Sequence, residues 1–455
     1  MFGGLMNSNR FAVLAGSALL AGGLSISPAQ AADLGGDCCA DLEERVATLE
    51  ATTARKGNRK VSLTISGWVN AGLMIWDDGV DSDAYVVSDN GSTLGTRITF
   101  AGNATINHDW SAGYNITIET QADDNFIGET LSNGNTQNQN NDDTANLGIL
   151  YSFMWVKSQH LGTVSWGLQS QATDNISIVD LSGTLFSGNN VVFNGNTFLL
   201  RRANGSGTLI TDANWGHALG CSTIGQDCHG VTTNTIKYQS PTFAGFTLAA
   251  SWGENDFWDA ALKYAGEFGA FKVAAAAGYS EWTNNDHFVT NITLIDNNVT
   301  DLESELFELG ASIMHTPTGL FLSGSYSDHK FTDLNAGNRV AIADTDSWYL
   351  KGGIKQSWSP LGATAIYGEY AVYNDGLVGG LADIILNNAG VMATGLTDSK
   401  VERYGVGVHQ WIDAAAMQLY AKWDRYELEA STNGVRHGLD GNKLDNVTVG
   451  GTIFF

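Results

Sequence analysis

The 455-residue chain has only 4 prolines and 4 cysteines, and only 16% of its residues are charged. After residue 31 it lacks any apolar run near the roughly 18–20 residues that a membrane-spanning helix needs. Basic residues are scarce, with 23 Lys and Arg against 48 Asp and Glu, which argues against a nucleic-acid partner because phosphate backbones require a basic surface. The aromatic content of 10% argues against a disordered acidic chain. The remaining possibility is a folded protein, and its fold must account for the many Gly and aromatic residues.

The N-terminus indicates export. Arg10 precedes an apolar stretch, residues 11–26, and an A-x-A sequence ends at Ala31. This arrangement is typical of a secretory signal peptide, so we expect residues 1–31 to be removed. A short membrane anchor is the alternative, although the apolar run is short for a span.

Residues 32–60 form a polar stub with one apolar seam at Leu42, Val46, Leu49 and Thr53. We expect a short helix that is solvated or part of a periplasmic coiled coil. Its adjacent residues Cys38 and Cys39 would form a strained bond, so interchain bridges and free thiols both remain open.

From residue 61 to residue 455, apolar and polar residues alternate. In one segment Val61, Leu63 and Ile65 alternate with Ser62 and Thr64, and similar segments continue to the end of the chain. Such alternation predicts strands with one apolar and one wet face. A soluble sandwich would give the same alternation, so this pattern alone does not identify the fold.

The lengths of the connections separate these possibilities. Seven short turns alternate with long links, and one further link near 253–257 is short for its class. Short turns on one side and long loops on the other are typical of an outer-membrane barrel. We therefore predict an all-β transmembrane antiparallel barrel of about 16 strands. The long links cover about residues 76–93, 123–146, 171–231, 280–305, 328–344, 374–400 and 427–444.

One hairpin carries a family resemblance. Residues 234–246 read NTIKYQSPTFAGF, which resembles the N-x-I-x-Y-x-S-P-x-F-x-G-F hairpin of Gram-negative general porins, most closely the alphaproteobacterial ones. The terminal Phe455 also resembles the assembly signal of bacterial outer-membrane proteins. The resemblance implies a multi-pass outer-membrane channel for passive diffusion of small hydrophilic solutes and ions. It also implies a homotrimer among outer-membrane lipid and lipopolysaccharide, with the third long loop folded inward.

The third loop, residues 171–231, contains charged residues and cysteines that are candidates for a functional role. Its expected constriction charges are Asp174, Asp180, Asp212, Arg201 and Arg202. The loop also holds Cys221 and Cys228, which should form a disulfide in an oxidising periplasm. A Cys/His metal site with His217 and His229 is the alternative, but this spacing matches no zinc pattern.

Strand parity predicts the charges of the inner wall. Four acidic positions, Glu119, Glu308, Glu369 and Asp424, share the inward parity with a larger basic set. A basic wall facing acidic loops would sort hydrated ions. The acidic exterior favours cations and the basic wall opposes them, and we expect a small preference for cations. The predicted pore-lining basic residues are Arg97, Lys237, Lys263, Lys272, Lys351, Lys355, Arg403 and Lys422.

Three alternative functions, an enzyme, a structural tether and a divalent-ion site, have only weak support in this sequence. There is no G-x-S-x-G, H-E-x-x-H or P-loop motif, so we expect no enzyme, no cofactor and no metal. A barrel enzyme would need a His beside a Ser or Asp, and His409 has inward parity in an apolar strand, which is typical of a structural histidine. A second alternative is a structural tether that reaches the cell wall through residues 32–60. Paired loop acids such as Asp77 and Asp78 could bind a divalent ion, but exposed acids usually only solvate.

Overall fold

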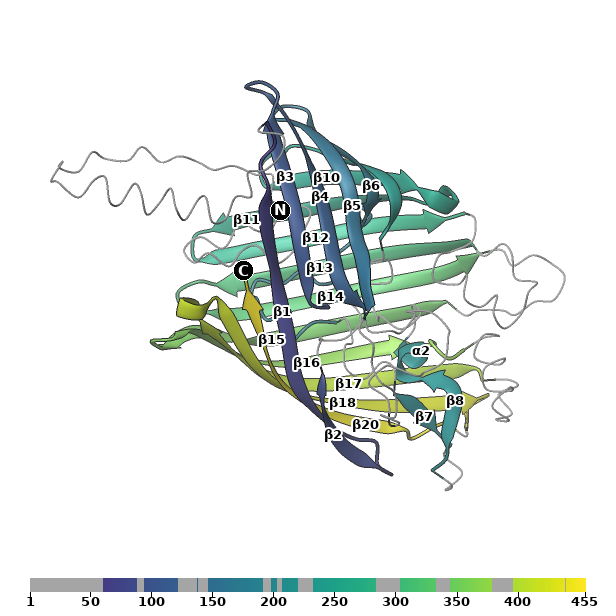
Figure 1. Cartoon of the computed structure of the whole chain (residues 1–455). Coiled ribbons are helices and arrows are strands. Elements are labelled where there is room, and N and C mark those ends of the chain that lie inside the picture. The colour runs from purple at the N-terminus through teal and green to yellow at the C-terminus, as the bar shows by residue number, and fades with distance from the viewer. Residues whose placement is uncertain are drawn as a thin grey trace.

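Sixteen antiparallel strands form one closed wall in the computed structural model (Figure 1). The strands are β1 (Thr64–Asp77), β3 (Arg97–Thr105), β4 (Trp110–Gln121), β5 (Asn146–Ser158), β6 (Gly162–Gln169), β9 (Thr233–Gln239), β10 (Phe246–Gly253), β11 (Trp258–Phe268), β12 (Phe271–Trp282), β13 (Glu303–His315), β14 (Leu320–Thr332), β15 (Thr345–Ser359), β16 (Gly362–Asn374), β17 (Asp398–Ile412), β18 (Met417–Thr432) and β20 (Lys443–Phe454). The predicted fold class and strand number are confirmed.

The structure describes only part of the chain. The predicted leader 1–31, the stub up to residue 59 and all four cysteines lie outside the described residues. The described residues are 60–87, 94–121, 137, 146–190, 198–202, 207–219, 232–283, 303–332, 344–378, 396–437 and 439–455.

The barrel closes between its first and last strands. Residues 68–77 of β1 pair in antiparallel register with residues 445–454 of β20. Just beyond this register, Gly67 and Phe455 exchange two backbone hydrogen bonds of 3.0 and 3.1 Å. Closure matters because lipid cannot satisfy the free N–H and C=O groups of a sheet edge.

Short elements extend the wall at the end where the long loops gather. The strand β2 (Ser82–Val87) pairs with β1, and β19 (Val435–Arg436) pairs with β18. The third loop contains its own hairpin, β7 (Leu199–Arg201) and β8 (Leu209–Asn214), followed by the helix α2 (Trp215–Leu219). Two 3-10 turns, Glu254–Asp256 and Asp413–Ala415, complete the elements of the described residues. No helix within the described ranges is long and apolar enough to cross a membrane.

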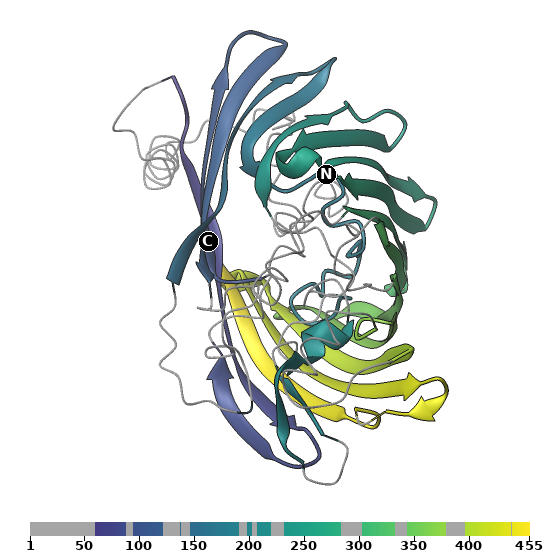
Figure 2. The same cartoon turned by 90° about the vertical axis from the view of Figure 1, so that its right-hand side faces the viewer.

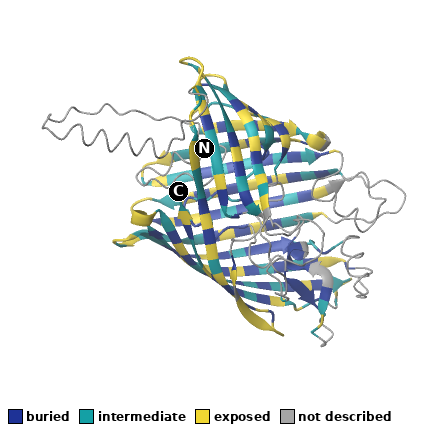
Figure 3. Ribbon diagram, viewed as in Figure 1, coloured by how far each residue is buried: buried dark blue, intermediate teal, exposed yellow. Residues whose placement is uncertain are grey.

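The predicted alternation of faces is present along the strands (Figure 3). On β1, Ile65, Val69 and Leu73 are exposed on the outer face, whereas Trp68 and Met74 are buried on the inner face. An apolar outer face is what a barrel in lipid requires. The tight turns at the opposite end favour glycine: Gly319, with φ +68°, would place a β-carbon 1.8 Å from the Lys355 carbonyl oxygen.

Candidate functional site

Residues 171–190 cross the interior of the barrel, and we call this segment the arm (Figure 2). The arm follows β6 and lies on small inward residues of β10 to β13. A β-carbon on Gly278 would lie 2.2 Å from the Ile176 side chain, and one on Gly310 would lie 1.9 Å from the Ile176 carbonyl oxygen. The small side chains of the alanine-rich stretch of β12 therefore leave room for the arm to pack against the wall. The apolar contact comprises Ala172, Ile176, Val179, Leu181, Ala249, Ala261, Ala274 and Ala276.

A buried carboxylate, Asp259, anchors the start of the arm. It accepts hydrogen bonds from the Thr173 amide at 2.7 Å and hydroxyl at 2.8 Å. It also accepts bonds from the amide and hydroxyl of Ser251, whose hydroxyl in turn accepts from the Ala172 amide. Asp259 was not among the residues predicted from the sequence, although it lies four residues before Lys263 on the same face of β11. Strand parity applied to every charged residue would have found it.

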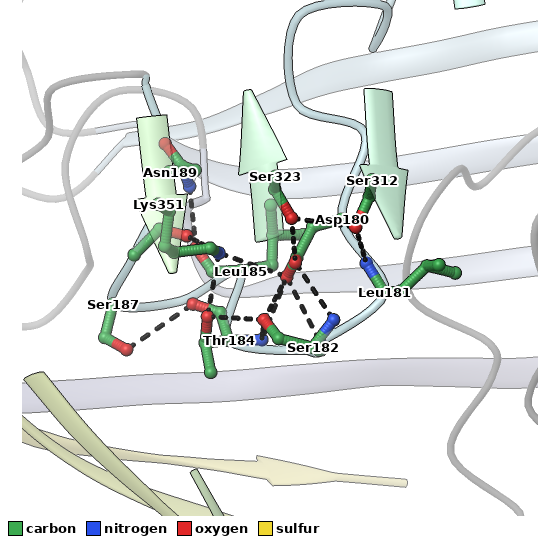
Figure 4. A network of polar contacts seen from close by, with 12 residues as sticks. Asp180, Leu181, Ser182, Thr184, Leu185, Ser187, Asn189, Ser312, Ser323 and Lys351 are labelled. Carbon is green, nitrogen blue, oxygen red and sulfur yellow. Dashed lines mark hydrogen bonds and ion pairs between the residues drawn. The ribbon is translucent and has the colours of Figure 1, made fainter. Parts of the chain in front are cut away.

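A second anchor surrounds Asp180 (Figure 4). Its carboxylate accepts bonds from the backbone of Ser182 and Thr184 and from the Ser323 hydroxyl of β14. The Lys351 ammonium of β15 lies 3.2 Å from it. Lys351 also donates to the Thr184 hydroxyl at 2.9 Å and to the Gly188 carbonyl oxygen at 2.6 Å. We expected the Lys351 side chain to face the solvent in the pore, but the arm covers it and only 1% of the residue's surface is exposed.

Three further lysines and one arginine from the predicted basic set also contact the arm or the residue that precedes it. Lys237 donates to the Ser170 carbonyl oxygen at 2.6 Å, and Lys263 donates to that of Asp174 at 3.0 Å. Lys355 donates to the Ser182 carbonyl oxygen at 2.7 Å. Its ammonium also lies 3.9 Å from the ring centroid of Trp411. The arginine is Arg403, which donates to the Asn189 carbonyl oxygen at 2.8 Å.

Arg403 is also part of a charge network on the inner face of β16 to β18. It pairs with Glu369, and its Nε lies 3.5 Å from Asp424. Lys422 lies 2.9 Å from Asp424 and 3.5 Å from Glu369. The Tyr349 hydroxyl donates to Glu369 at 2.6 Å. These four predicted inward charges thus neutralise one another.

The two remaining predicted basic residues of the wall have nearby acidic partners. Arg97 of β3 lies 2.7 Å from Glu119 of β4, and its guanidinium lies over the Trp68 ring. Lys272 lies 3.5 Å from Glu267 on the neighbouring strand. Asp259 and Glu267 were both absent from the predicted acidic set. The inner wall is therefore less basic than the sequence analysis indicated.

The arm also reaches the seam of the barrel. The Phe186 ring packs edge-on against Trp68 of β1 and Phe454 of β20, with centroid distances of 5.7 and 5.8 Å. Leu94 and Tyr420 complete this buried group. The arm is thus held between the β10–β17 wall and the β1–β20 wall.

In the second half of the third loop, the described residues 198–202 and 207–219 lie over one side of the barrel mouth, and we call them the lid (Figures 1 and 2). Arg201 lies 2.7 Å from Asp78 and 2.9 Å from Asp81, both in the first loop. Asn442, in the last loop, exchanges two hydrogen bonds with the Arg201 backbone. Arg201 was expected at the constriction, but it instead ties three loops together because Asp78 and Asp81 neutralise it.

A hydrophobic core lies beneath the lid. Its lid residues include Phe198, Leu200 and Trp215, and the Phe198 ring packs against Trp76 of β1 at 5.1 Å. The inner faces of β15 to β18 and β20 complete this core. This core was not predicted, because the lid residues show no strand or helix period long enough to detect.

Two other charges were predicted at the constriction, Arg202 and Asp212. The backbone N–H of Arg202 donates to the Thr208 carbonyl oxygen, and the side chain of Asp212 lies outside the described residues.

The two carboxylates of the arm have opposite pKa shifts. Burial raises the pKa of Asp174, and a hydrogen bond from Ser170 and the charges of Lys263 and Lys237 only partly oppose this. Burial would also raise the pKa of Asp180, but the Lys351 ammonium and the Ser182 bonds outweigh it, so this pKa lies below its usual value. Asp180 is therefore held as an anion, whereas ionised Asp174 is disfavoured.

A closed antiparallel barrel with an apolar exterior, a polar interior and an inward loop defines an outer-membrane channel. The profile of the Gram-negative porin family matches residues 16–437. The chain belongs to this family, and it is a multi-pass protein of the bacterial outer membrane that forms a channel.

Solved structures show the same fold. The anion-selective porin of Comamonas acidovorans is 16% identical, with a TM-score of 0.53 over 87% of this chain and 100% of that chain. The outer membrane channel DcaP of Acinetobacter baumannii is 12% identical, with a TM-score of 0.51 over 88% and 99%. OmpF of Salmonella typhi, solved with daunomycin, is 13% identical, with a TM-score of 0.50 over 88% and 99%. No curated protein sequence matches the chain.

Proposed function

We propose that the barrel is a water-filled pore for passive diffusion of small hydrophilic solutes and ions, narrowed by the arm. The observation that carries this proposal is the arm itself, which is fixed at both ends across the interior of a closed barrel. Polar and charged side chains of the inner wall would line the path. Lumen positions of this kind tune selectivity in porin-like barrels.

Planar-bilayer recording tests this proposal. Purified protein should produce stepwise conductance that grows with salt concentration, and a salt gradient should give a stable reversal potential. A barrel that inserts in the bilayer and yet passes no current would contradict the proposal.

We further propose that the chain belongs to the alphaproteobacterial branch of the family and assembles as a homotrimer that contacts lipopolysaccharide. The hairpin at residues 234–246 supports the branch, and family membership supports the trimer. Mass measurement in mild detergent tests the assembly. A monomer in every detergent that preserves conductance would contradict it.

Four proposals concern residues outside the described ranges. Residues 1–31 act as a leader, residues 32–59 belong to a periplasmic stub that contacts the cell wall, Cys221 pairs with Cys228, and Ala32 begins the mature chain. N-terminal sequencing and non-reducing peptide mapping test the leader and the disulfide. Envelope fractionation of a chain lacking residues 32–59 tests the contact with the cell wall.

A catalytic role is not favoured. The most suggestive pair is His409, whose Nδ1 lies 3.2 Å from the Ser187 hydroxyl of the arm. Its Nε2 faces the Gln418 side-chain oxygen at 3.0 Å, and its ring stacks on Trp411. None of His409 is exposed, so a substrate has no access, and the pair is better explained as a further contact of the arm.

A further inference from the structure

Five basic side chains of the inner wall bind backbone carbonyl oxygens, and the order of their strands around the wall follows the order of the oxygens along the loop. The oxygens belong to residue 170 and to four residues of the arm, and the cations lie on β9, β11, β15 and β17. Strands that follow one another around the wall thus hold successive points of one loop. The pairs are Lys237 with Ser170, Lys263 with Asp174, Lys355 with Ser182, Lys351 with Gly188 and Arg403 with Asn189.

The acceptor in each pair explains what these cations do. A hydrogen bond from a charged donor is about twice as strong as a neutral one, and a carbonyl acceptor does not depend on the side chain of its residue. Lys351 is 1% exposed and Arg403 is fully buried, so neither can contact a passing solute. Lys351 and Arg403 therefore act on the loop and not on the solution, whereas Lys237, Lys263 and Lys355 are partly exposed and donate to the loop at the edge of the path.

The formal charges of this wall also balance. On the inner face of β9 to β18 together with the arm, the described residues include seven cations and seven carboxylates. The cations are Lys237, Lys263, Lys272, Lys351, Lys355, Arg403 and Lys422, and the carboxylates are Asp174, Asp180, Asp259, Glu267, Glu308, Glu369 and Asp424. The whole chain has a formal charge of −25, so the excess negative charge lies elsewhere, mainly at the loops.

We propose that the five wall cations fasten the arm by its backbone. Because these cations are occupied by the loop and balanced by carboxylates, they do not attract anions, and the channel prefers small cations. This inference rests on the proposed function, because it requires a conducting pore. With the wall balanced, the acidic excess at the entrance concentrates small cations and repels small anions. The fastened arm in turn keeps the narrow part of the path at a fixed width.

The first test measures the reversal potential of the unmodified channel in a KCl gradient at low salt. The expected result is a higher permeability for K⁺ than for Cl⁻, which weakens at 1 M salt because the screening length falls to about 3 Å. A preference for Cl⁻ would overturn this inference and leave the channel function intact. An absence of any current would instead contradict the channel function.

The second test separates fastening from ion filtering. Lys355→Met removes one fastener, and Lys355→Arg preserves a charged donor. Fastening predicts several-fold larger open-channel noise and passage of larger sugars for Lys355→Met, with near-normal noise for Lys355→Arg. The net-charge control is Lys400→Met on the outer face, where Lys400 pairs with Glu402 at 2.9 Å.

The outcomes are distinct. If Lys355→Met shifts the reversal potential towards cations while its noise and sugar cutoff stay normal, Lys355 is an ion filter and the fastening role is wrong. If its noise rises and Lys400→Met remains quiet, fastening is supported. Heat-modifiable migration on gels shows whether each variant has formed its barrel.

Discussion

At the scale of single residues, the arm shows how one loop uses two aspartates differently. Asp180 accepts hydrogen bonds from its own turn and pairs with Lys351, whereas burial of Asp174 outweighs the nearby lysine charges. The two residues have the same side chain and lie six positions apart. Their surroundings alone decide which one stabilises the loop as an anion.

Asp180→Asn should loosen the arm. Removing one partner of a buried ion pair typically costs about 3–5 kcal/mol because the other charge stays buried and unpaired. Limited proteolysis of folded protein in detergent should therefore cut the arm faster in this variant. The matched variant Asp174→Asn should be cut no faster than the unmodified protein, since it removes a disfavoured charge. Equal protection of both variants would contradict this account.

The same pair predicts an effect of acid. The pKa of Asp180 is lowered from 3.8, so its pair with Lys351 stabilises the arm fully at pH values above 3.8. This stabilisation is lost as the pH falls from there through the lower folded pKa. Channel noise should therefore rise at pH values below 3.8 in the unmodified protein. In Asp180→Asn the noise should already be high near neutral pH and change little.

At the scale of elements, the arm and the inner wall are complementary in size. Inward glycines and alanines of β10 to β13 leave room for the arm, and lysines of β9, β11 and β15 bind the loop backbone. The lid is held by different contacts, an extensive apolar core with one arginine at its edge. The third loop is therefore two separately fastened pieces.

Gly310→Val should displace the arm without opening the barrel. Its β-carbon would lie 1.9 Å from the Ile176 carbonyl oxygen, a distance that no rotamer can relieve. We expect higher single-channel conductance and faster entry of sugars in liposome swelling. The control is Gly368→Val, because a β-carbon there would meet its nearest atom at 3.8 Å. The same conductance in both variants would show that the arm does not limit flow.

At the scale of the whole molecule, one seam closes the wall. The terminal Phe455 exchanges two backbone hydrogen bonds with Gly67, next to the register that joins β20 to β1. The acidic excess of the chain then lies outside a balanced inner wall. Closure of the sheet encloses a path through the barrel, and the charge distribution determines which ions gather at its entrance.

Deleting Phe455 should impair assembly. The deletion removes both bonds to Gly67 and the end of the strand that closes the sheet, which exposes a sheet edge to lipid. Heat-modifiable protein in isolated outer membranes should fall several-fold relative to Phe455→Tyr, which preserves the backbone. Normal amounts from the deleted chain would contradict the assigned importance of this residue.

The sequence by itself determined the barrel. Alternation of apolar and polar residues sets the two faces of each strand, and the sorting of short and long links sets their number, because both are local properties. The same parity placed Arg97, Lys351 and Arg403 on the inner face.

Only the tertiary structure decided what those side chains contact. Lys351 binds residues more than 160 positions away, and Arg201 binds the first and last loops instead of the constriction. Irregular loop segments carry no periodic pattern, so their position follows from packing against the finished wall. The sequence thus encodes which face each charge occupies, whereas the folded loop determines whether that charge meets solvent, a carbonyl oxygen or another charge.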